Sequence, residues 1–269
     1  MSLKVRIARA FPRLYERYHR AFARFEYSTI GHFINEYSRR RKNIFFIQVG
    51  ANDGITWDPY HFFIVRDRWK GIVIEPQSLV FEQRLKRTYA NVDGIELLNV
   101  AVDAEDGTRP LYKYAFTTSR WATGLASFDK ENLISNFETD YVQDNIRKEN
   151  VSVSRDPSEY LTTEQVRCMS FSTILDRWPG KTIDFLITDA ERFDIPILNT
   201  FPLDRTRPRN IVFELPPTPL DQYFTDFIIK LRRYGYRLLI EGSDCIAVLS
   251  PDALAASAPE HARRSPRTD

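Results

Sequence analysis

Apolar residues in the middle of this chain gather in short runs, with longer amphipathic stretches between them. Short apolar runs that lead into turn residues are typical of strands. We predict strands near residues 44–49, 71–75, 95–99, 183–188 and 211–215. We predict helices around residues 59–68, 78–89, 171–177, 193–200 and 220–234. Strands that alternate with helices indicate an α/β fold, with a largely parallel sheet and helices on both faces.

The pattern changes near the end of the chain. Tyr236–Glu241 and Asp244–Leu249 are apolar runs separated by a Gly-Ser turn, which predicts an antiparallel hairpin. Residues 251–269 are rich in Ala, Ser, Pro and Arg, and this composition predicts a disordered tail. We therefore expect the main domain to span residues 43–250.

Residues 104–165 interrupt the alternation of strands and helices. Aromatic side chains are mixed there with many charges, and no period is sustained. Long insertions beyond the strand ends of an open α/β sheet tend to carry specificity. We predict a lid-like insertion over the substrate. The alternative is a peripheral insertion that is packed by its own aromatic residues.

Residues 1–42 have apolar positions at helical spacing, with arginines on the faces between them. Eleven basic residues against three acidic ones give this segment a net charge of +8, and the remainder of the chain carries −6. We predict a basic amphipathic helix that packs on its own domain, covers the substrate cleft, contacts a partner subunit or lies on an anionic membrane surface. The apolar positions are Phe11, Leu14, Tyr15, Tyr18, Phe22 and Phe25.

The composition narrows the class of protein. With 269 residues, 43% of them hydrophobic, the chain can bury a sizeable core. Cys168 and Cys245 are too few for a disulfide scaffold, which favours a reduced, cytoplasmic compartment. No apolar run is long enough for a signal peptide or a membrane span. The basic cluster at residues 39–42 lacks the pattern of a nucleic-acid reader, so we expect no nucleic-acid partner.

The most informative motif is a glycine turn after the first predicted strand. Residues 45–54 read FFIQVGANDG, and the second predicted strand ends at Glu75, 21 positions after Gly54. Glycine lets the backbone turn tightly and approach a ligand, and an acid at the tip of the next strand can accept hydrogen bonds from both ribose hydroxyls. This layout is typical of a nucleoside-binding βαβ unit.

Acidic residues follow two later strands. Asp189, Glu191 and Asp194 come after one strand, and Glu214 lies at the end of the next. Parallel strands bring these side chains to the same sheet edge as the glycine turn. There they could act as a general base, accept hydrogen bonds from a polyhydroxylated substrate or bind a hard cation. Capping of a helix start is the alternative role for Asp189 and Asp194.

Five motifs in this order, FIQVGANDG, GIVIEPQ, LLNVAV, DFLITDAERFD and IVFEL, resemble the FkbM family of S-adenosylmethionine-dependent methyltransferases over residues 43–249. The resemblance implies a class I methyltransferase (Rossmann-like) fold, with a seven-stranded, mostly parallel sheet and an antiparallel last strand. It also implies S-adenosylmethionine as cofactor and O-methylation, often of a sugar hydroxyl in a glycan, glycolipid or natural product.

The resemblance assigns cofactor-binding roles by position. It implies that the methionine part of the cofactor lies near Gln48, Gly50, Asn52 and Gly54. It implies that Glu75 accepts the ribose hydroxyls, and that the adenine lies near Asn99, Ala101 and Val102. The chain departs from the family pattern at Gln48, where an acid is often present, at Thr188, where an aliphatic residue is usual, and at Arg192, where glycine is usual. Arginine adds bulk and five donors, so it either binds an anionic substrate group or blocks the pocket.

A sulfonium methyl group is already activated, so catalysis needs the acceptor hydroxyl to be positioned and its proton removed. Asp189 is the first candidate for that base, with Glu191 and Glu214 in support. A magnesium-assisted version, with these carboxylates as ligands, is an alternative. Two rival classes are an NAD-dependent oxidoreductase, which needs a third glycine that this turn lacks, and a noncatalytic cofactor-binding or scaffold protein, motivated by Arg192.

Overall fold

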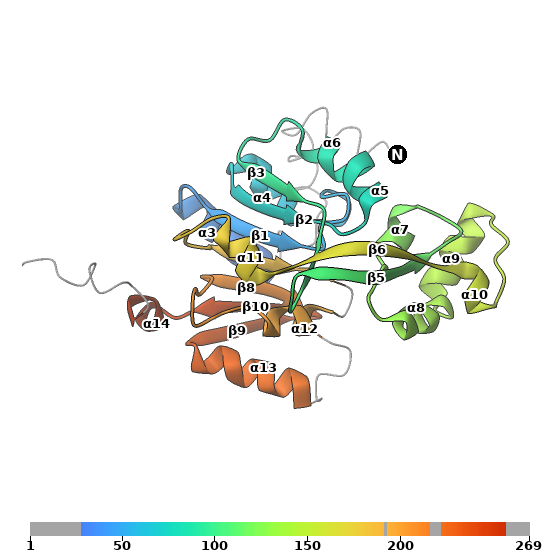
Figure 1. Ribbon diagram of the computed structural model, residues 1–269. Coiled ribbons are helices and arrows are strands. Elements are labelled where there is room, and N and C mark those ends of the chain that lie inside the picture. The colour runs from blue at the N-terminus through green and yellow to red at the C-terminus, as the bar shows by residue number, and fades with distance from the viewer. Residues whose placement is uncertain (1–27, 191–192, 216–221, 257–269) are drawn as a thin grey trace, which may run out of the picture.

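The computed structural model describes residues 28–190, 193–215 and 222–256. A seven-stranded sheet lies at its centre, in the order β3-β2-β1-β7-β8-β10-β9 (Figure 1). β10 is antiparallel to both β8 and β9, and the other pairs are parallel. The strands are β1 (Phe45–Val49), β2 (Lys70–Ile74), β3 (Ile95–Leu98), β7 (Phe185–Thr188), β8 (Asn210–Glu214), β9 (Tyr236–Glu241) and β10 (Asp244–Leu249). The predicted class I methyltransferase sheet, with its antiparallel last strand, is confirmed.

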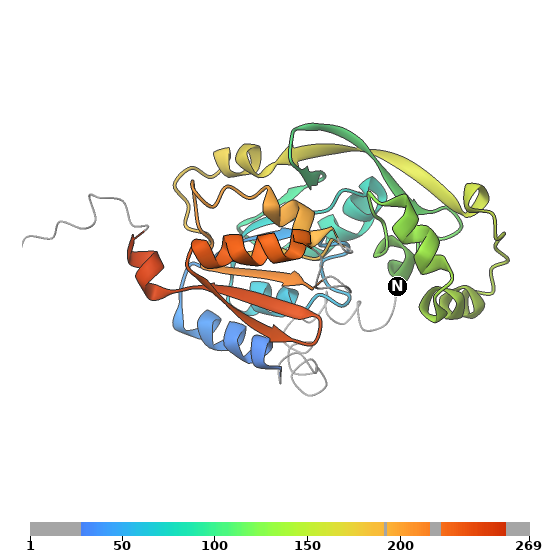
Figure 2. The same cartoon turned by 90° about the horizontal axis from the view of Figure 1, so that it is seen from below.

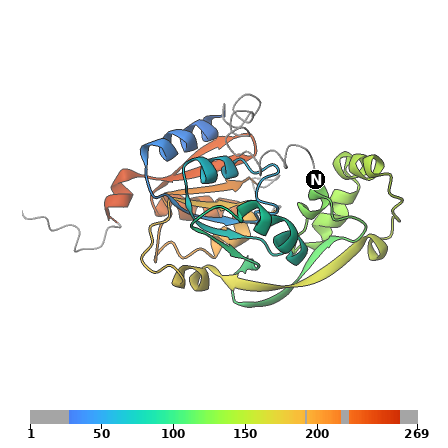
Figure 3. The same ribbon diagram turned by 90° about the horizontal axis from the view of Figure 1, so that it is seen from above.

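Helices cover both faces of this sheet, as Figures 2 and 3 show for α3 and α13. The first face carries α3 (Thr29–Arg40), α4 (Tyr60–Arg66), and α5 (Ser78–Val80), which continues through a π-helical turn (Phe81–Leu85) into α6 (Lys86–Tyr89). The second face carries α11 (Phe171–Asp176), α12 (Asp194–Asn199) and α13 (Gln222–Arg233). Among the described residues, no helix is long and apolar enough to cross a membrane.

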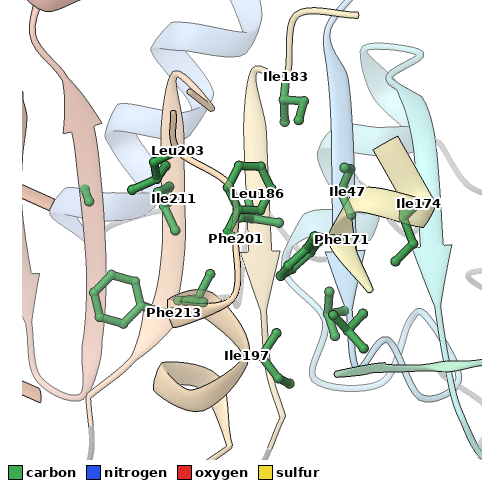
Figure 4. Packing of buried hydrophobic residues seen from close by; sticks show 14 of the residues in the cluster. Ile47, Phe171, Ile174, Ile183, Leu186, Ile197, Phe201, Leu203, Ile211 and Phe213 are labelled. Carbon is green, nitrogen blue, oxygen red and sulfur yellow. The ribbon is translucent and has the colours of Figure 1, made fainter. Parts of the chain in front are cut away.

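The apolar runs form strands because both of their faces are buried. Alternate residues of a strand point to opposite faces, so Phe46 joins the core under α3 and α4, whereas Ile47 joins the core under α11 and α12. Figure 4 shows the second of these cores, where Ile47, Leu186 and Ile211 lie on three neighbouring strands, with Phe171 between Ile47 and Leu186. The two cores fix the central strands in register and so fix the edge where β1, β2 and β7 end.

The ends of the chain differ in part from the prediction. The apolar pattern between Phe11 and Phe25 lies outside the described residues. α3 follows it, and the hydroxyl of Ser28 caps this helix by accepting a 2.9 Å hydrogen bond from Gly31 N. Pro251–Ala256, at the start of the segment predicted to be disordered, forms the short helix α14. That helix is held because Ser250 N donates to Gly235 O at 3.0 Å and Ser250 Oγ accepts from Ala253 N. Disorder of the rest of the tail stays a prediction.

The segment between β3 and α11 forms its own small sheet and an arm, where the sequence indicated no regular elements. β4 (Ala101–Asp103), β6 (Leu161–Ser170) and β5 (Gly107–Tyr114) pair in that order, and β5 and β6 form a long antiparallel pair that reaches beyond the main sheet (Figure 1). We call residues 107–170 the arm. Between its strands it carries α7 (Arg120–Thr123), α8 (Lys130–Phe137), α9 (Asp140–Glu149) and α10 (Pro157–Tyr160).

The arm has an aromatic core of its own. Phe137 and Tyr160 stack at 4.0 Å between ring centroids, and Tyr114 packs beside both rings. This packing agrees with the alternative of an insertion held by its own aromatic residues. The arm also returns to the sheet, however, because α7 lies against the turn that follows β1. Whether the arm acts as a lid stays a prediction.

Candidate functional site

A cavity lies where the carboxyl ends of β1, β2 and β7 meet α7 and the following residues of the arm. The space between its walls, with its open mouth included, is about 640 Å³. Its charged walls are Glu75, Asp189 and Arg120. Its apolar walls are Val49, Val100, Ala101, Val102, Leu111, Phe128, Phe193 and Ile197. An apolar slot with few charged groups suits a nucleoside with a charged substituent.

The two predicted glycines allow other parts of the protein to pack closely against the turn after β1. Gly50 has φ +80°, and a Cβ there would lie 1.9 Å from Asp189 O. Gly54 has φ +69°, and a Cβ there would lie 2.7 Å from the Tyr89 ring. Gly50 lines the cavity, whereas Gly54 packs under the helix that follows β2. Gly50 is therefore required by the close approach of the Asp189 backbone, and Gly54 by the side chains packed against it. The contact of either glycine with a cofactor stays a prediction.

Glu75 is the centre of a buried hydrogen-bond ring that joins β2, the glycine turn and the arm. Its Oε2 accepts from Asn52 N at 2.9 Å, and its Oε1 accepts from Gln77 N at 2.9 Å and Gln77 Nε2 at 3.1 Å. Gln77 Nε2 also donates to Thr123 O, and Asn52 Nδ2 donates to Thr123 Oγ1. The position of α7 is therefore tied to that of the carboxylate.

The Glu75 carboxyl group is only 2% exposed. Burial raises its pKa to about 7, and the three hydrogen bonds and the charge of Arg120 oppose that shift. A carboxylate has about four acceptor positions, so one remains beside the cavity. Glu75 thus lies where an acceptor for a ribose hydroxyl is predicted.

The remaining predicted cofactor residues divide into two groups. Ala101 and Val102 line the cavity. Gln48 and Asn99 do not; they lie behind its walls. Gln48 Nε2 donates to Asp58 Oδ2 at 2.8 Å, and Asn99 Nδ2 donates to the carbonyl oxygens at the end of β2. Their direct contact with a cofactor stays a prediction.

The acidic residues predicted for the site lie in different positions. Asp189 is exposed at the cavity wall, and desolvation raises its pKa while Arg120 opposes the shift. Asp194 is 2% exposed and accepts long hydrogen bonds, 3.3 and 3.4 Å, from Ala190 N in the turn before α12. The start of α12 has no side-chain cap, so Asp194 holds the turn rather than capping the helix. Glu191 lies outside the described residues, and so does Arg192.

Glu214 belongs to a carboxylate cluster next to Asp189, outside the cavity walls. Its pKa is raised to about 7 by desolvation and by the charges of Asp189, Asp194 and Asp244. Burial, and then the charges of Asp244, Asp58, Asp189 and Glu214, raise the pKa of Tyr60. These four carboxylates therefore lie near enough to Tyr60 for their charges to act on it, and Glu214 and Asp244 are paired across β8 and β10. We call Asp58, Tyr60, Asp189, Glu214 and Asp244 the acidic cluster.

The described residues contain no group of three ligand-type side chains that could hold a metal ion. The magnesium-assisted alternative therefore depends on Glu191, outside the described residues, and stays a prediction.

Sequence reasoning missed the contributions of the arm and of the loop before α4. Arg120 and Thr123 lie in a segment without periodicity, so no pattern indicated them. Asp58 had a local signal, because an Asp-Pro pair before an apolar helix is typical of a helix start, and its Oδ1 accepts from Tyr60 N at 2.9 Å. Trp57 is 87% exposed and has φ +62°.

Comparison with protein families matches residues 48–238 to the Methyltransferase FkbM domain. Comparison with curated proteins gives no significant match. Among solved structures, the chain is similar to a human methyltransferase 10 domain containing protein, with 11% identity, a TM-score of 0.42, and coverage of 81% of this chain and 79% of that one. It is also similar to the O-methyltransferase TomG from Streptomyces achromogenes, solved with SAM, with 12% identity, a TM-score of 0.41 and coverage of 93% and 91%.

Proposed function

This chain belongs to the FkbM family of methyltransferases, and we propose that it transfers the methyl group of S-adenosylmethionine to a hydroxyl group of a sugar-containing acceptor. The acceptor classes that this proposal covers are glycans, glycolipids and glycosylated natural products. The family match favours methyl transfer over the oxidoreductase alternative.

The cavity fits the cofactor by the chemistry of its walls. A nucleoside needs apolar surface for its base and a hydrogen-bond acceptor for its ribose, and the walls offer Ala101, Val102 and Phe128 beside Glu75. S-adenosylmethionine, when bound, supplies a methyl group that is already activated by its sulfonium. The residues of the chain then have to bind it, position the acceptor and remove one proton.

The observation that carries the sugar assignment is the acidic cluster beside an exposed indole. Carboxylates accept hydrogen bonds from hydroxyl groups, and the flat faces of sugar rings pack on aromatic surfaces as other apolar surfaces do. Trp57 directly precedes Asp58 of the cluster. Its loop is held by Asp53, which accepts from Ile55 N at 3.1 Å, Thr56 N at 2.8 Å and Thr56 Oγ1 at 2.7 Å. Trp57 therefore follows a loop segment that Asp53 holds in place, and its indole is exposed.

Asp189 is the side chain best placed to remove the proton. It lines the cavity and belongs to the acidic cluster, so it borders both the cofactor and the acceptor regions. Because its pKa is raised, it is a stronger base than an ordinary surface aspartate. The neighbouring Glu214 is a second acceptor for substrate hydroxyls.

The test is methyl transfer from labelled S-adenosylmethionine to glycan and glycolipid extracts, followed by hydrolysis and identification of methylated monosaccharides. Asp189→Asn should lower kcat about a hundredfold while the folded protein still binds S-adenosylhomocysteine. Trp57→Ala should raise KM for the sugar acceptor about tenfold, or ~1.4 kcal/mol. Ile240→Ala removes another exposed apolar side chain, on β9, and should change neither constant.

Two outcomes would contradict the proposal. Label that appears only in non-carbohydrate products would exclude a sugar acceptor, and tight cofactor binding without any transfer would favour the scaffold alternative. Activity after exhaustive chelation separates the metal-free reaction from the magnesium-assisted one.

A further inference from the structure

Arg120 is the cation of the cavity. Of the charged described residues that line it, Glu75 and Asp189 are negative and Arg120 is positive. Its side chain is 25% exposed. Its charge lowers the pKa values of both Asp189 and Glu75, against the effect of burial. Arg120 therefore shares the cavity wall with both carboxyl groups and lies near enough to each for its charge to act on it.

One N–H group of the Arg120 guanidinium is buried and donates no hydrogen bond to the described residues. This group is the Nε–H. The neighbouring carboxylate oxygen, Asp53 Oδ1, is 4.0 Å away, beyond hydrogen-bond distance, and already accepts from Ile55 N and Thr56 N. Buried donors nearly always have a partner in a complete site, so an acceptor group is missing here.

The surrounding chain holds Arg120 in place and leaves it room. α7 is fixed to the glycine turn and to β2 by the hydrogen bonds of Thr123 to Asn52 and Gln77. Gly124 ends this helix, and a Cβ there would lie 2.3 Å from Arg120 Nη1. A larger residue at position 124 would therefore push the guanidinium out of its present position.

We propose that Arg120 binds the methionyl carboxylate of S-adenosylmethionine. This inference rests on the proposed function and adds a cofactor-binding residue from the arm. The cofactor has a positively charged centre, a ribose and one carboxylate; Asp189 and Glu75 complement the first two. The planar guanidinium is the side chain that best matches a carboxylate, and Arg120 is the cation on the described cavity wall.

The experiment compares two ligands that differ in one group. Isothermal titration calorimetry gives Kd for S-adenosylhomocysteine and for its decarboxylated analogue, with wild type, Arg120→Gln and Gly124→Ala. A pH of about 9 is used because it lies well above the Glu75 pKa of about 7 and so leaves room for the rise in this pKa that loss of Arg120 causes. Arg120→Gln should weaken S-adenosylhomocysteine about tenfold to a hundredfold and leave the analogue within about twofold.

Gly124→Ala tests the same contact without removing the charge. It should weaken S-adenosylhomocysteine more than the analogue, and it should have no effect on either ligand in the Arg120→Gln background. If Arg120→Gln fails to fold, as thermal unfolding would show, the selectivity of Gly124→Ala between the ligands decides the question. Equal losses for both ligands, or no loss, would overturn the assignment of Arg120. A wild type that binds neither ligand would instead overturn the proposed cofactor.

Discussion

The buried carboxyl group of Glu75 should make the protein less stable as the pH rises. Its pKa is raised from an ordinary 4.5 to about 7 in the folded protein, chiefly by burial. Between these values the unfolded chain has lost the proton and the folded chain keeps it, so the unfolded state binds fewer protons. The free energy of unfolding therefore falls as the pH rises through this window. At ~1.36 kcal/mol per pKa unit, the fall due to Glu75 is about 3 kcal/mol.

The assay is urea unfolding of wild type and Glu75→Gln at about pH 5 and pH 8. Glutamine has no charge to desolvate, so the free energy of unfolding of the variant should fall by about 2–3 kcal/mol less than that of wild type between these two pH values. Glutamine also turns one of its two donors toward Asn52 N, which lies 2.9 Å from Oε2 in the wild type. That penalty is the same at both pH values and cancels in the difference. Equal pH dependence of the two proteins would refute the reasoning.

The packing of single residues gives further predictions. Gly50→Ala places a Cβ 1.9 Å from Asp189 O at φ +80° and should lower the free energy of unfolding by more than about 3 kcal/mol, measured in urea. Gly107→Ala, where nothing lies within 4 Å of the added Cβ, is its control and should change stability by less than about 0.5 kcal/mol. Phe137→Ala removes a ring that is 3% exposed from the core of the arm and should cost about 3–5 kcal/mol. In limited proteolysis of the Phe137→Ala variant, the arm should be cleaved earlier than the main sheet.

The sheet could be predicted from the sequence because its strands are buried on both faces. A strand such as β7 has all four residues buried and is apolar except for Thr188 at its end, and that run stands out against its neighbours. The hairpin of β9 and β10 could be predicted for a related reason, since β10 is mostly buried and is separated from β9 by a turn at Gly242 with φ +64°. These strands also give the order of the motifs, which is why Glu75 and Asp189 could be placed at one edge.

The arm could not be predicted because its strands do not alternate. β5 and β6 have exposed and half-buried residues in irregular order, so neither a two-residue nor a helical period appears. β6 pairs with both β5 and β4, and the register of these pairs is set only when the fold has formed. The sequence pattern therefore does not predict the elements of the arm that place Arg120 and Thr123 at the cavity.

The site therefore has one wall that the sequence predicts, from the main sheet, and one that it does not predict, from the arm. The ends of β1, β2 and β7 supply the turn, Glu75 and Asp189, and the core under them fixes their positions. The arm supplies the facing wall through one short helix, which is held by the hydrogen bonds from Asn52 and Gln77 to Thr123. Because Asn52 and Gln77 also donate to Glu75, a ligand that draws on the Glu75 carboxylate acts on the same ring that holds α7. Cofactor binding and the position of the arm are thus expected to depend on each other, through side chains that touch both.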